Sequence, residues 1–298
     1  MRSRSIARSV VTGLVVAGAA VAAGSTPAQA AGDGVVRVVG TQLRYAALDD
    51  VQNAIKINQA AEYVYVEDLA GLQPGNGCEH FMANTNVVRC SAAGITDLLI
   101  RTYAGRDQVS NNATVPSHLY LGDGDDRVYG SPAADTMHGG NGVDYLYGNG
   151  SADVLYGNAG ADRLFGGLDN DELHGGTGRD RLSGHGGDDR VFGDQQADDL
   201  YGGDGLDEVN GGDGDDHVYG ENDNDTVRGD AGDDHAYGGE ADDQVYGGDG
   251  NDELHGDNGR DRVYGENGDD YLNGGNGLNV LNGGPGNDEC AVGAEDTC

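Results

Sequence analysis

Between residues 121 and 291 the apolar and polar positions repeat with a fixed period of nine residues. The interval divides into 19 consecutive units without insertion or deletion, for example GGNGVDYLY at 139–147 and GGDGDDHVY at 211–219. Leu, Val or Met occupies the eighth position in 17 units, between residues such as Tyr, Arg and Glu. One inward side chain between two outward neighbours is the pattern of a short β-strand. Each unit therefore predicts one strand of about three residues at its end.

The first six positions of each unit predict a turn. Glycine fills the first position in 18 units and the fourth in 13, and these positions need positive φ or close backbone approach. A strand this short cannot bury apolar surface alone, and therefore successive units must stack on one another. Two units then close one flat coil of 18 residues. We expect an all-β fold at 121–291, in which these coils stack into a rod whose interior is two rows of aliphatic side chains.

The segment before the repeats also predicts strands. Alternating β-type runs occupy 35–39, 42–46, 54–58, 63–66, 87–90 and 98–103, and none has helical periodicity. The open end of such a rod must be covered, because an exposed strand edge promotes aggregation. We therefore expect residues 31–120 to form a short N-terminal β cap. Residues 105–109, GRDQV, resemble a degenerate repeat within it.

The first thirty residues predict a secretory signal peptide. Three arginines precede an apolar run at 10–23, and Ala-Gln-Ala follows at 28–30. The run is shorter than a membrane span, and no later segment approaches that length. We expect a secreted, extracellular protein without a membrane span; the alternative is an uncleaved anchor at 1–30.

The four cysteines are disulfide candidates in an exported protein. The least demanding of their three connectivities pairs Cys78 with Cys90 and Cys290 with Cys298. The second pair would close a C-terminal cap at 292–298. Free thiols or a metal site are the alternatives.

The net charge limits the kinds of partner that the chain can bind. The chain has 52 Asp and Glu against 17 Lys and Arg, a net charge of −35, with 55 glycines and no tryptophan. Residues 121–298 carry 43 of the acidic and only 8 of the basic residues. Such a region repels nucleic acid and anionic lipid, and its few large apolar residues argue against a large globular enzyme. Cations are the expected partners.

The acidic position of the repeat points to one cation. Stacking places the sixth-position aspartates of units i and i+2 one strand spacing apart, where carboxylates repel unless a positive charge lies between them. Carboxylate and carbonyl oxygens favour calcium over magnesium when six to eight flexible ligands are available. Of 17 such pairs, 16 have Asp at both positions, Asn279 being the exception. Up to roughly 16 Ca²⁺ would bring +32 against the region's −35.

The unit GGxGxDxUx resembles the nonapeptide of the RTX family of secreted calcium-binding proteins, and the signal peptide makes the chain similar to actinobacterial members. The resemblance implies a parallel β-roll (a Ca-binding β-solenoid), with Ca²⁺ held between stacked turns by the sixth-position Asp and by carbonyls of the first four positions. The unit GSPAADTMH at 130–138 departs from the pattern, so sites using its turn are expected to be weak. Carried over to this chain, the side-chain ligands are Asp126, Asp135, Asp144, Asp153, Asp162, Asp171, Asp180, Asp189, Asp198, Asp207, Asp216, Asp225, Asp234, Asp243, Asp252, Asp261, Asp270 and Asp288.

Catalytic chemistry is not expected. The sequence has no G-x-S-x-G, HExxH, phosphate loop or CxxC, and Glu79-His80 fits an exposed loop. Outward His138, His174 and His255 stand where Tyr is commonest, so we favour face filling over transition-metal binding. The aromatic row at the ninth position has two interpretations, a stacked ladder, which we favour, or a sugar-binding stripe.

The sequence therefore predicts a secreted, non-enzymatic calcium-binding protein that folds when it binds Ca²⁺, with an extracellular structural or adhesion-type role. A cell surface or polysaccharide is the expected class of further partner. The alternative is a non-catalytic accessory or remnant of an RTX toxin or of a polysaccharide-modifying enzyme.

Overall fold

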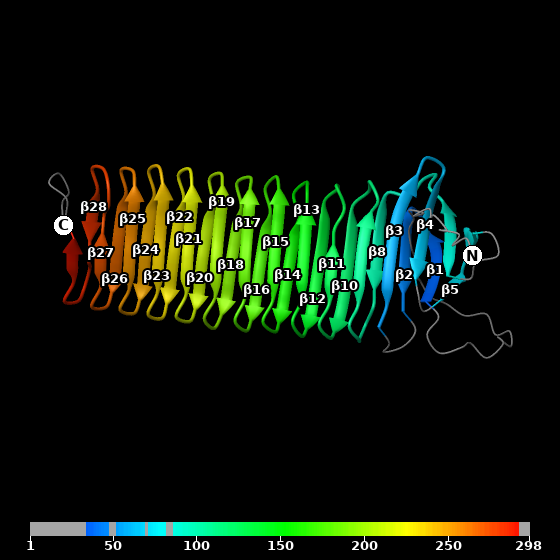
Figure 1. The fold of residues 1–298 in the computed structure, drawn as a ribbon, viewed down its shortest axis with the longest axis horizontal. Coiled ribbons are helices and arrows are strands. Elements are labelled where there is room, and N and C mark those ends of the chain that lie inside the picture. The colour runs from blue at the N-terminus through cyan, green and yellow to red at the C-terminus, as the bar shows by residue number, and fades with distance from the viewer. Residues whose placement is uncertain (1–33, 48–51, 69–70, 82–85, 292–298) are drawn as a thin grey trace, which may run out of the picture.

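The chain folds into a straight rod built from two facing sheets (Figure 1). The computed structural model describes residues 34–47, 52–68, 71–81 and 86–291. These residues form 29 strands and no helix. The expected signal peptide and the C-terminal cap at 292–298 lie outside the described residues.

From β8 onward the strands alternate along the chain between the two sheets. Sheet A has 14 strands, in the order β5 (Leu72–Pro74), β1 (Gly34–Val39), β2 (Gln42–Ala46), β8 (Asp97–Arg101), β10 (Ser117–Asp123), β12 (Asp135–Asn141), β14 (Val154–Ala159), β16 (Glu172–Thr177), β18 (Arg190–Gln195), β20 (Glu208–Asp213), β22 (Thr226–Ala231), β24 (Gln244–Asp249), β26 (Arg262–Asn267) and β28 (Val280–Asn282). Sheet B has 15 strands, in the order β6 (Cys78–His80), β7 (Val87–Ser91), β4 (Tyr63–Asp68), β3 (Ala54–Ala60), β9 (Gln108–Asn112), β11 (Arg127–Tyr129), β13 (Tyr145–Asn149), β15 (Arg163–Leu168), β17 (Arg181–Gly186), β19 (Asp199–Asp204), β21 (His217–Asn222), β23 (His235–Glu240), β25 (Glu253–Asn258), β27 (Tyr271–Asn273) and β29 (Glu289–Ala291).

Within the repeats the strands pair in parallel with a register of 18 residues. Leu146 lies beside Leu164, and Leu164 beside Leu182, while Leu155 and Leu173 pair in the opposite sheet. All these side chains are fully buried. The parallel β-roll and its two aliphatic rows are therefore confirmed.

The strands are longer than the sequence predicted. Most span six residues, for example β16, which covers positions seven to nine of one unit and one to three of the next. Gly176 and Thr177 at the start of a unit continue the pairing begun by Glu172. The prediction of a six-residue turn was wrong in extent, because the first three positions still form inter-strand hydrogen bonds. Only positions four to six change direction.

The cap continues the two sheets of the roll. The six predicted strands correspond to β1, β2, β3, β4, β7 and β8, whereas the short β5 and β6 were not predicted. β1 with β2, and β3 with β4, form antiparallel hairpins. The inner strand of each hairpin then pairs in parallel, β2 with β8 and β3 with β9. The cap therefore presents each repeat sheet with a strand of the same direction as its own.

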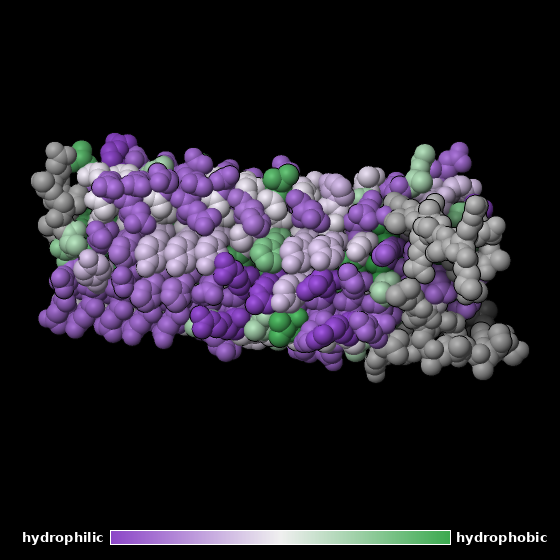
Figure 2. Space-filling view, viewed as in Figure 1, coloured by the Kyte–Doolittle hydropathy of each residue, from purple (hydrophilic) through white to green (hydrophobic). Residues whose placement is uncertain are grey.

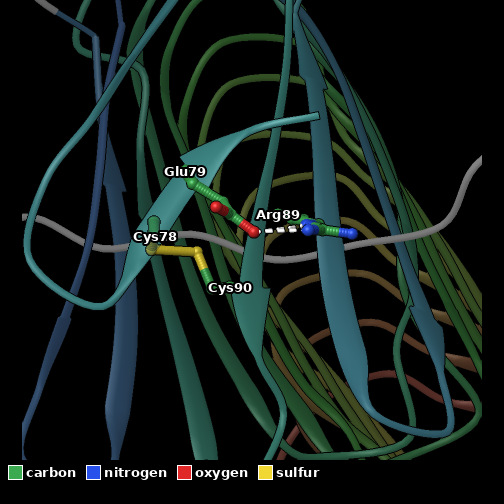
Figure 3. The surroundings of a disulfide bond; sticks show 4 residues. All are labelled: Cys78, Glu79, Arg89 and Cys90. Carbon is green, nitrogen blue, oxygen red and sulfur yellow. Dashed lines mark hydrogen bonds and ion pairs between the residues drawn. A yellow bond between two sulfur atoms is a disulfide. The ribbon is translucent and has the colours of Figure 1, made fainter. Parts of the chain in front are cut away.

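A disulfide joins the two outermost strands of sheet B. Cys78 of β6 pairs with Cys90 of β7, as predicted. On the next rung Glu79 Oε1 accepts a hydrogen bond from Arg89 Nε at 2.7 Å (Figure 3). The Arg89 guanidinium also lies over the Tyr63 ring, 4.7 Å from its centroid. Cys298 is outside the described residues, so the predicted Cys290–Cys298 bond stays a prediction.

The chain offers a direct test of the buried aliphatic row. Replacing Leu200 by Ala should lower the free energy of unfolding by about 2–5 kcal/mol, because the side chain is fully buried and its removal leaves a cavity. Leu206→Ala, in the next turn, is the control, since Leu206 is 58 % exposed. Urea unfolding at one fixed calcium concentration measures both. Equal losses for the two variants would contradict the assigned interior.

Candidate metal sites

The sixth-position aspartates form two continuous ladders along the edges of the rod. Each lies where a turn enters its strand and is almost completely buried, Asp288 excepted. Its Oδ1 accepts a hydrogen bond from the backbone N–H of the aspartate 18 residues earlier. Asp144 N donates to Asp162 Oδ1 at 2.8 Å, and Asp162 N donates to Asp180 Oδ1 at 2.7 Å. One carboxylate oxygen thus fixes the stacking of two turns.

The second carboxylate oxygen, Oδ2, is the candidate metal ligand. A buried carboxylate oxygen without a hydrogen-bond donor is costly, so a repeated one calls for an explanation. It is buried and has no hydrogen-bond partner among the described residues in Asp126, Asp144, Asp153, Asp162, Asp171, Asp180, Asp189, Asp198, Asp207, Asp216, Asp225, Asp234, Asp243, Asp252 and Asp270.

Oδ2 and a backbone carbonyl oxygen meet beside the first-position glycine. A Cβ built on Gly193 would lie 2.5 Å from Asp198 Oδ2 and 2.5 Å from the carbonyl oxygen of Gly211, in the next stacked turn. Both distances are too short for a carbon atom, so any side chain at this position would displace the two oxygens. Carboxylate and carbonyl oxygens are the ligands that Ca²⁺ takes in proteins, and glycine lets one of each kind converge here.

The fourth-position glycines bring the turns close together. Gly142 has a φ of 131°, and a Cβ on it would collide with the carbonyl oxygen of Gly124 in the turn below. Non-glycine residues at this position, such as Ser151 and Asp169, adopt φ values of 66° and 70° instead. The backbone oxygens are therefore packed against the neighbouring turn, as a site built partly from carbonyls requires.

No three His, Cys, Asp or Glu side chains gather to hold a metal ion within the described part of the chain. Each candidate site contributes one carboxylate oxygen and depends on backbone oxygens for the rest. The histidines join aromatic stacks instead: His138 lies between Tyr120 and Tyr156, with ring centroids 4.8 and 4.7 Å away.

The ninth-position aromatic rings also stack on one another. Tyr201, Tyr219 and Tyr237 follow one another at centroid distances of 5.0 and 4.9 Å, with nearly parallel planes. The predicted ladder is confirmed. Because the ring faces are turned toward each other, only ring edges face outward, which does not suit stacking against sugar rings.

Burial strongly perturbs the acid–base chemistry of the ladder. Desolvation raises the pKa of Asp144 to about 8 and that of Asp198 to about 8, although a hydrogen bond from a neighbouring backbone N–H acts in the opposite direction. Nearby aspartates raise both values further, and Asp162 reaches about 7. Near neutral pH these aspartate side chains can therefore bind either a proton or a cation.

Three sequence-predicted positions differ from the rest. Asp135 is satisfied by the protein itself, since Ser117 Oγ donates to its Oδ1 and Ser131 N to its Oδ2, both at 2.6 Å. Asp135 belongs to the unit at 130–138, which departs from the repeat pattern and whose site is predicted from the sequence to be weak. Asp288 is only partly buried. Asn279 continues the ladder without charge, its Oδ1 accepting from Asp261 N at 2.8 Å.

The structure adds one aspartate that the sequence-based set omits. Asp107 is buried, and its N–H donates to Asp126 Oδ1 at 2.6 Å. β9, which follows it, pairs in parallel with β11. The signal was present in the degenerate repeat GRDQV, but one extra residue places Asp107 19 rather than 18 positions before Asp126.

Stability without metal should depend on pH in an unusual direction. The folded-state pKa values of about 6 to 8 exceed the unfolded value near 4, so the folded chain binds more protons between these limits. In EDTA the roll should be most stable below about pH 4 and lose stability as pH rises to about 8. Thermal unfolding in EDTA at pH 5 and pH 8 checks this; greater stability at pH 8 would contradict it.

A matched pair of glycine variants tests the metal space. In Gly184→Ala the new Cβ would collide with Oδ2 of Asp189 and lie 2.8 Å from its Cβ. We expect this variant to lose the local site and lower the metal-dependent Tm by several degrees. Gly186→Ala, in the same turn, meets only one atom, at 4.0 Å, and should leave the Tm nearly unchanged. If both variants unfold alike, the space beside the first glycine is not the site.

Comparison with known proteins agrees with this geometry. The family model described as the RTX calcium-binding nonapeptide repeat matches residues 118–146, 138–173, 165–200, 193–227, 201–236, 219–254 and 255–290. A comparison with curated proteins gave no match. The matches to the family model together cover 118–290, more than half of the chain. The chain therefore belongs to the RTX calcium-binding nonapeptide repeat family.

Proposed function

We propose that the protein is an exported calcium-dependent rod whose repeats fold as they bind Ca²⁺, and that it acts outside the cell as a non-enzymatic structural or adhesion-type module. The observation that carries the proposal is the regular row of buried Oδ2 atoms beside first-position glycines. So many buried carboxylates cannot all be ionised without counter-charge. Up to roughly 16 ions would balance nearly all of the charge of the repeat region.

In this proposal each part of the nonapeptide has a defined role. Bound calcium supplies positive charge between turns. The first glycine keeps the space open, Oδ2 of the sixth-position Asp and the carbonyl of the next stacked glycine face it, and Oδ1 holds the neighbouring backbone N–H. The buried leucine or valine two positions later then closes the interior. Binding and folding are thus one process.

Calcium-linked folding fits export. At the low calcium level inside a cell, a region with this charge and few apolar residues stays extended. Extracellular calcium modules bind at about 10⁻⁴–10⁻³ M, so the ions would load after export.

The exposed surface supports a rod with a structural role. The visible face in Figure 2 is mainly hydrophilic, with only isolated hydrophobic groups. The most exposed leucines, Leu168, Leu206 and Leu278, lie in separate turns. In the described part of the chain no helix is long and apolar enough to cross a bilayer.

A calcium titration of the exported chain, residues 31–298, followed by far-UV circular dichroism tests the proposal. We expect a cooperative gain of β-structure with Ca²⁺ and none with Mg²⁺ at equal ionic strength. Asp216→Asn should raise the calcium midpoint severalfold, because it removes a buried carboxylate. Asp215→Asn is the control, because residue 215 is exposed and the amide oxygen can still accept from Asp233 N. A spectrum that ignores calcium would refute the coupling of binding and folding.

A further inference from the structure

At the N-terminal end of the ladder, side chains stand where the other turns have their first glycine. The turn 102–107 stacks below the first repeat, with Arg127 N donating to Asp107 O at 2.9 Å. Thr102 stands five residues before Asp107, where the repeats have their first glycine. Its Oγ1 donates to the carbonyl oxygen of Leu121 at 2.8 Å, and both residues are buried. This carbonyl is the equivalent of the Gly211 oxygen that flanks the space beside Gly193.

The next turn on the same edge is also altered. Leu121 is the one first-position residue among the 19 units that is not glycine. This turn therefore carries a side chain at the position where the other turns have none. Arg106 and Arg127 line a cavity of about 480 Å³ here together with Asp107, Asp125 and Asp126, and the Arg106 guanidinium pairs with Asp125, so the two arginines offset part of the carboxylate charge at this end.

The opposite edge ends on neutral groups. Asp135 receives hydrogen bonds from Ser117 Oγ and Ser131 N, as described above. Ser117, 18 residues before Asp135, takes the sixth-position place in the rung below and itself accepts from Asn111 Nδ2 at 3.1 Å. On the first edge the corresponding rung below Asp107 is Asn53, whose Nδ2 donates to Asp107 Oδ1 at 3.0 Å. Both carboxylate ladders therefore stop at uncharged residues inside the cap.

The cap beneath these rungs has an apolar core and polar contacts that require no metal. Leu43, Ile57, Leu98 and Ile100 are fully buried in its strands. Tyr45 Oη lies 3.0 Å from Asn53 Oδ1 and 2.9 Å from Asp68 Oδ2. The Cys78–Cys90 disulfide closes the outer hairpin.

We propose that the chain from β1 to β12 folds without calcium, and that it is the template on which the calcium-dependent turns from residue 139 onward are added, coil by coil, toward the C-terminus. The inference rests on the proposed function for the calcium dependence of the later turns. Each new turn places its Asp Oδ1 on a backbone N–H of the preceding coil, so a formed coil is needed before the next one is held. The site of Asp135, whose two carboxylate oxygens are both satisfied by the protein, stays without metal, which lowers the sequence-based count of 16 ions by one.

Hydrogen exchange of the full oxidised chain at pH 7.5, read by mass spectrometry, tests the template. In EDTA we expect protected amides in β8 to β11 and fast exchange in β14 to β27. With calcium added below saturation, protection should spread from β14 toward β27. Fast exchange throughout in EDTA, or protection that begins near β27, would overturn the template while leaving calcium-coupled folding intact. Protection of all repeats in EDTA would refute the proposed function itself.

Variants of Thr102 separate the hydroxyl's role from general stability. Thr102→Gly opens the space above Asp107, so in EDTA β9 and β11 should exchange at least tenfold faster, and calcium should restore their protection. Thr102→Ser retains the hydroxyl and should exchange like the native chain. Thr96→Gly is the control for adding a glycine to the template, because Thr96 is exposed and, like Thr102, lies outside the strands. Equal exchange of β9 and β11 in the Gly and Ser variants of Thr102 would overturn the assignment.

Discussion

The structure depends on the burial of one carboxylate in nearly every nonapeptide. Oδ1 of each aspartate holds the backbone of the preceding coil, which fixes the register of the stack, while Oδ2 is left in a desolvated space. A hydrogen bond to one oxygen does not offset the cost of burying a whole charge. The same residue therefore orders the fold and makes it conditional on a proton or a cation. The raised pKa values of Asp144 and Asp198 reflect this cost of burying the charged carboxylate.

The thin interior makes this condition decisive. Each unit of nine residues buries a single aliphatic side chain, such as Leu164 or Val191, while the backbone of all nine residues must be ordered. Stacked aromatic rings add cross-strand contacts on the outer faces, but these are individually weak. Apolar burial alone is too small to order such a chain, so the charged edges decide whether the roll forms. Glycine is needed at the first position because a side chain there would collide with Oδ2 of the sixth-position aspartate.

Most of the roll could be predicted because it is a translational repeat. A nine-residue period with one inward aliphatic residue fixes both the stacking and the 18-residue register, and from these follow the two buried rows and the aligned aspartates. Strand length could not be read from the same pattern, since positions one to three pair through backbone groups whatever their side chains. The ends of the aspartate ladders could not be predicted from the repeat either. Asp107 is offset by one residue, and Ser117 reaches Asp135 from outside the counted units.

The same symmetry explains why the ends depart from the repeat. A cation between two turns takes oxygens from both, so a terminal rung with one stacked neighbour offers an incomplete set of ligands. A carboxylate there would be buried without adequate counter-charge. Within the described residues the ladders meet this problem with neutral groups: Asn53 and Ser117 below the first rungs, and Asn279 near the last. Hydroxyls and amides thus continue the hydrogen-bonded stacking beside the ends of the ladders, while the carboxylates that remain there are either satisfied by the protein, as in Asp135, or only partly buried, as in Asp288.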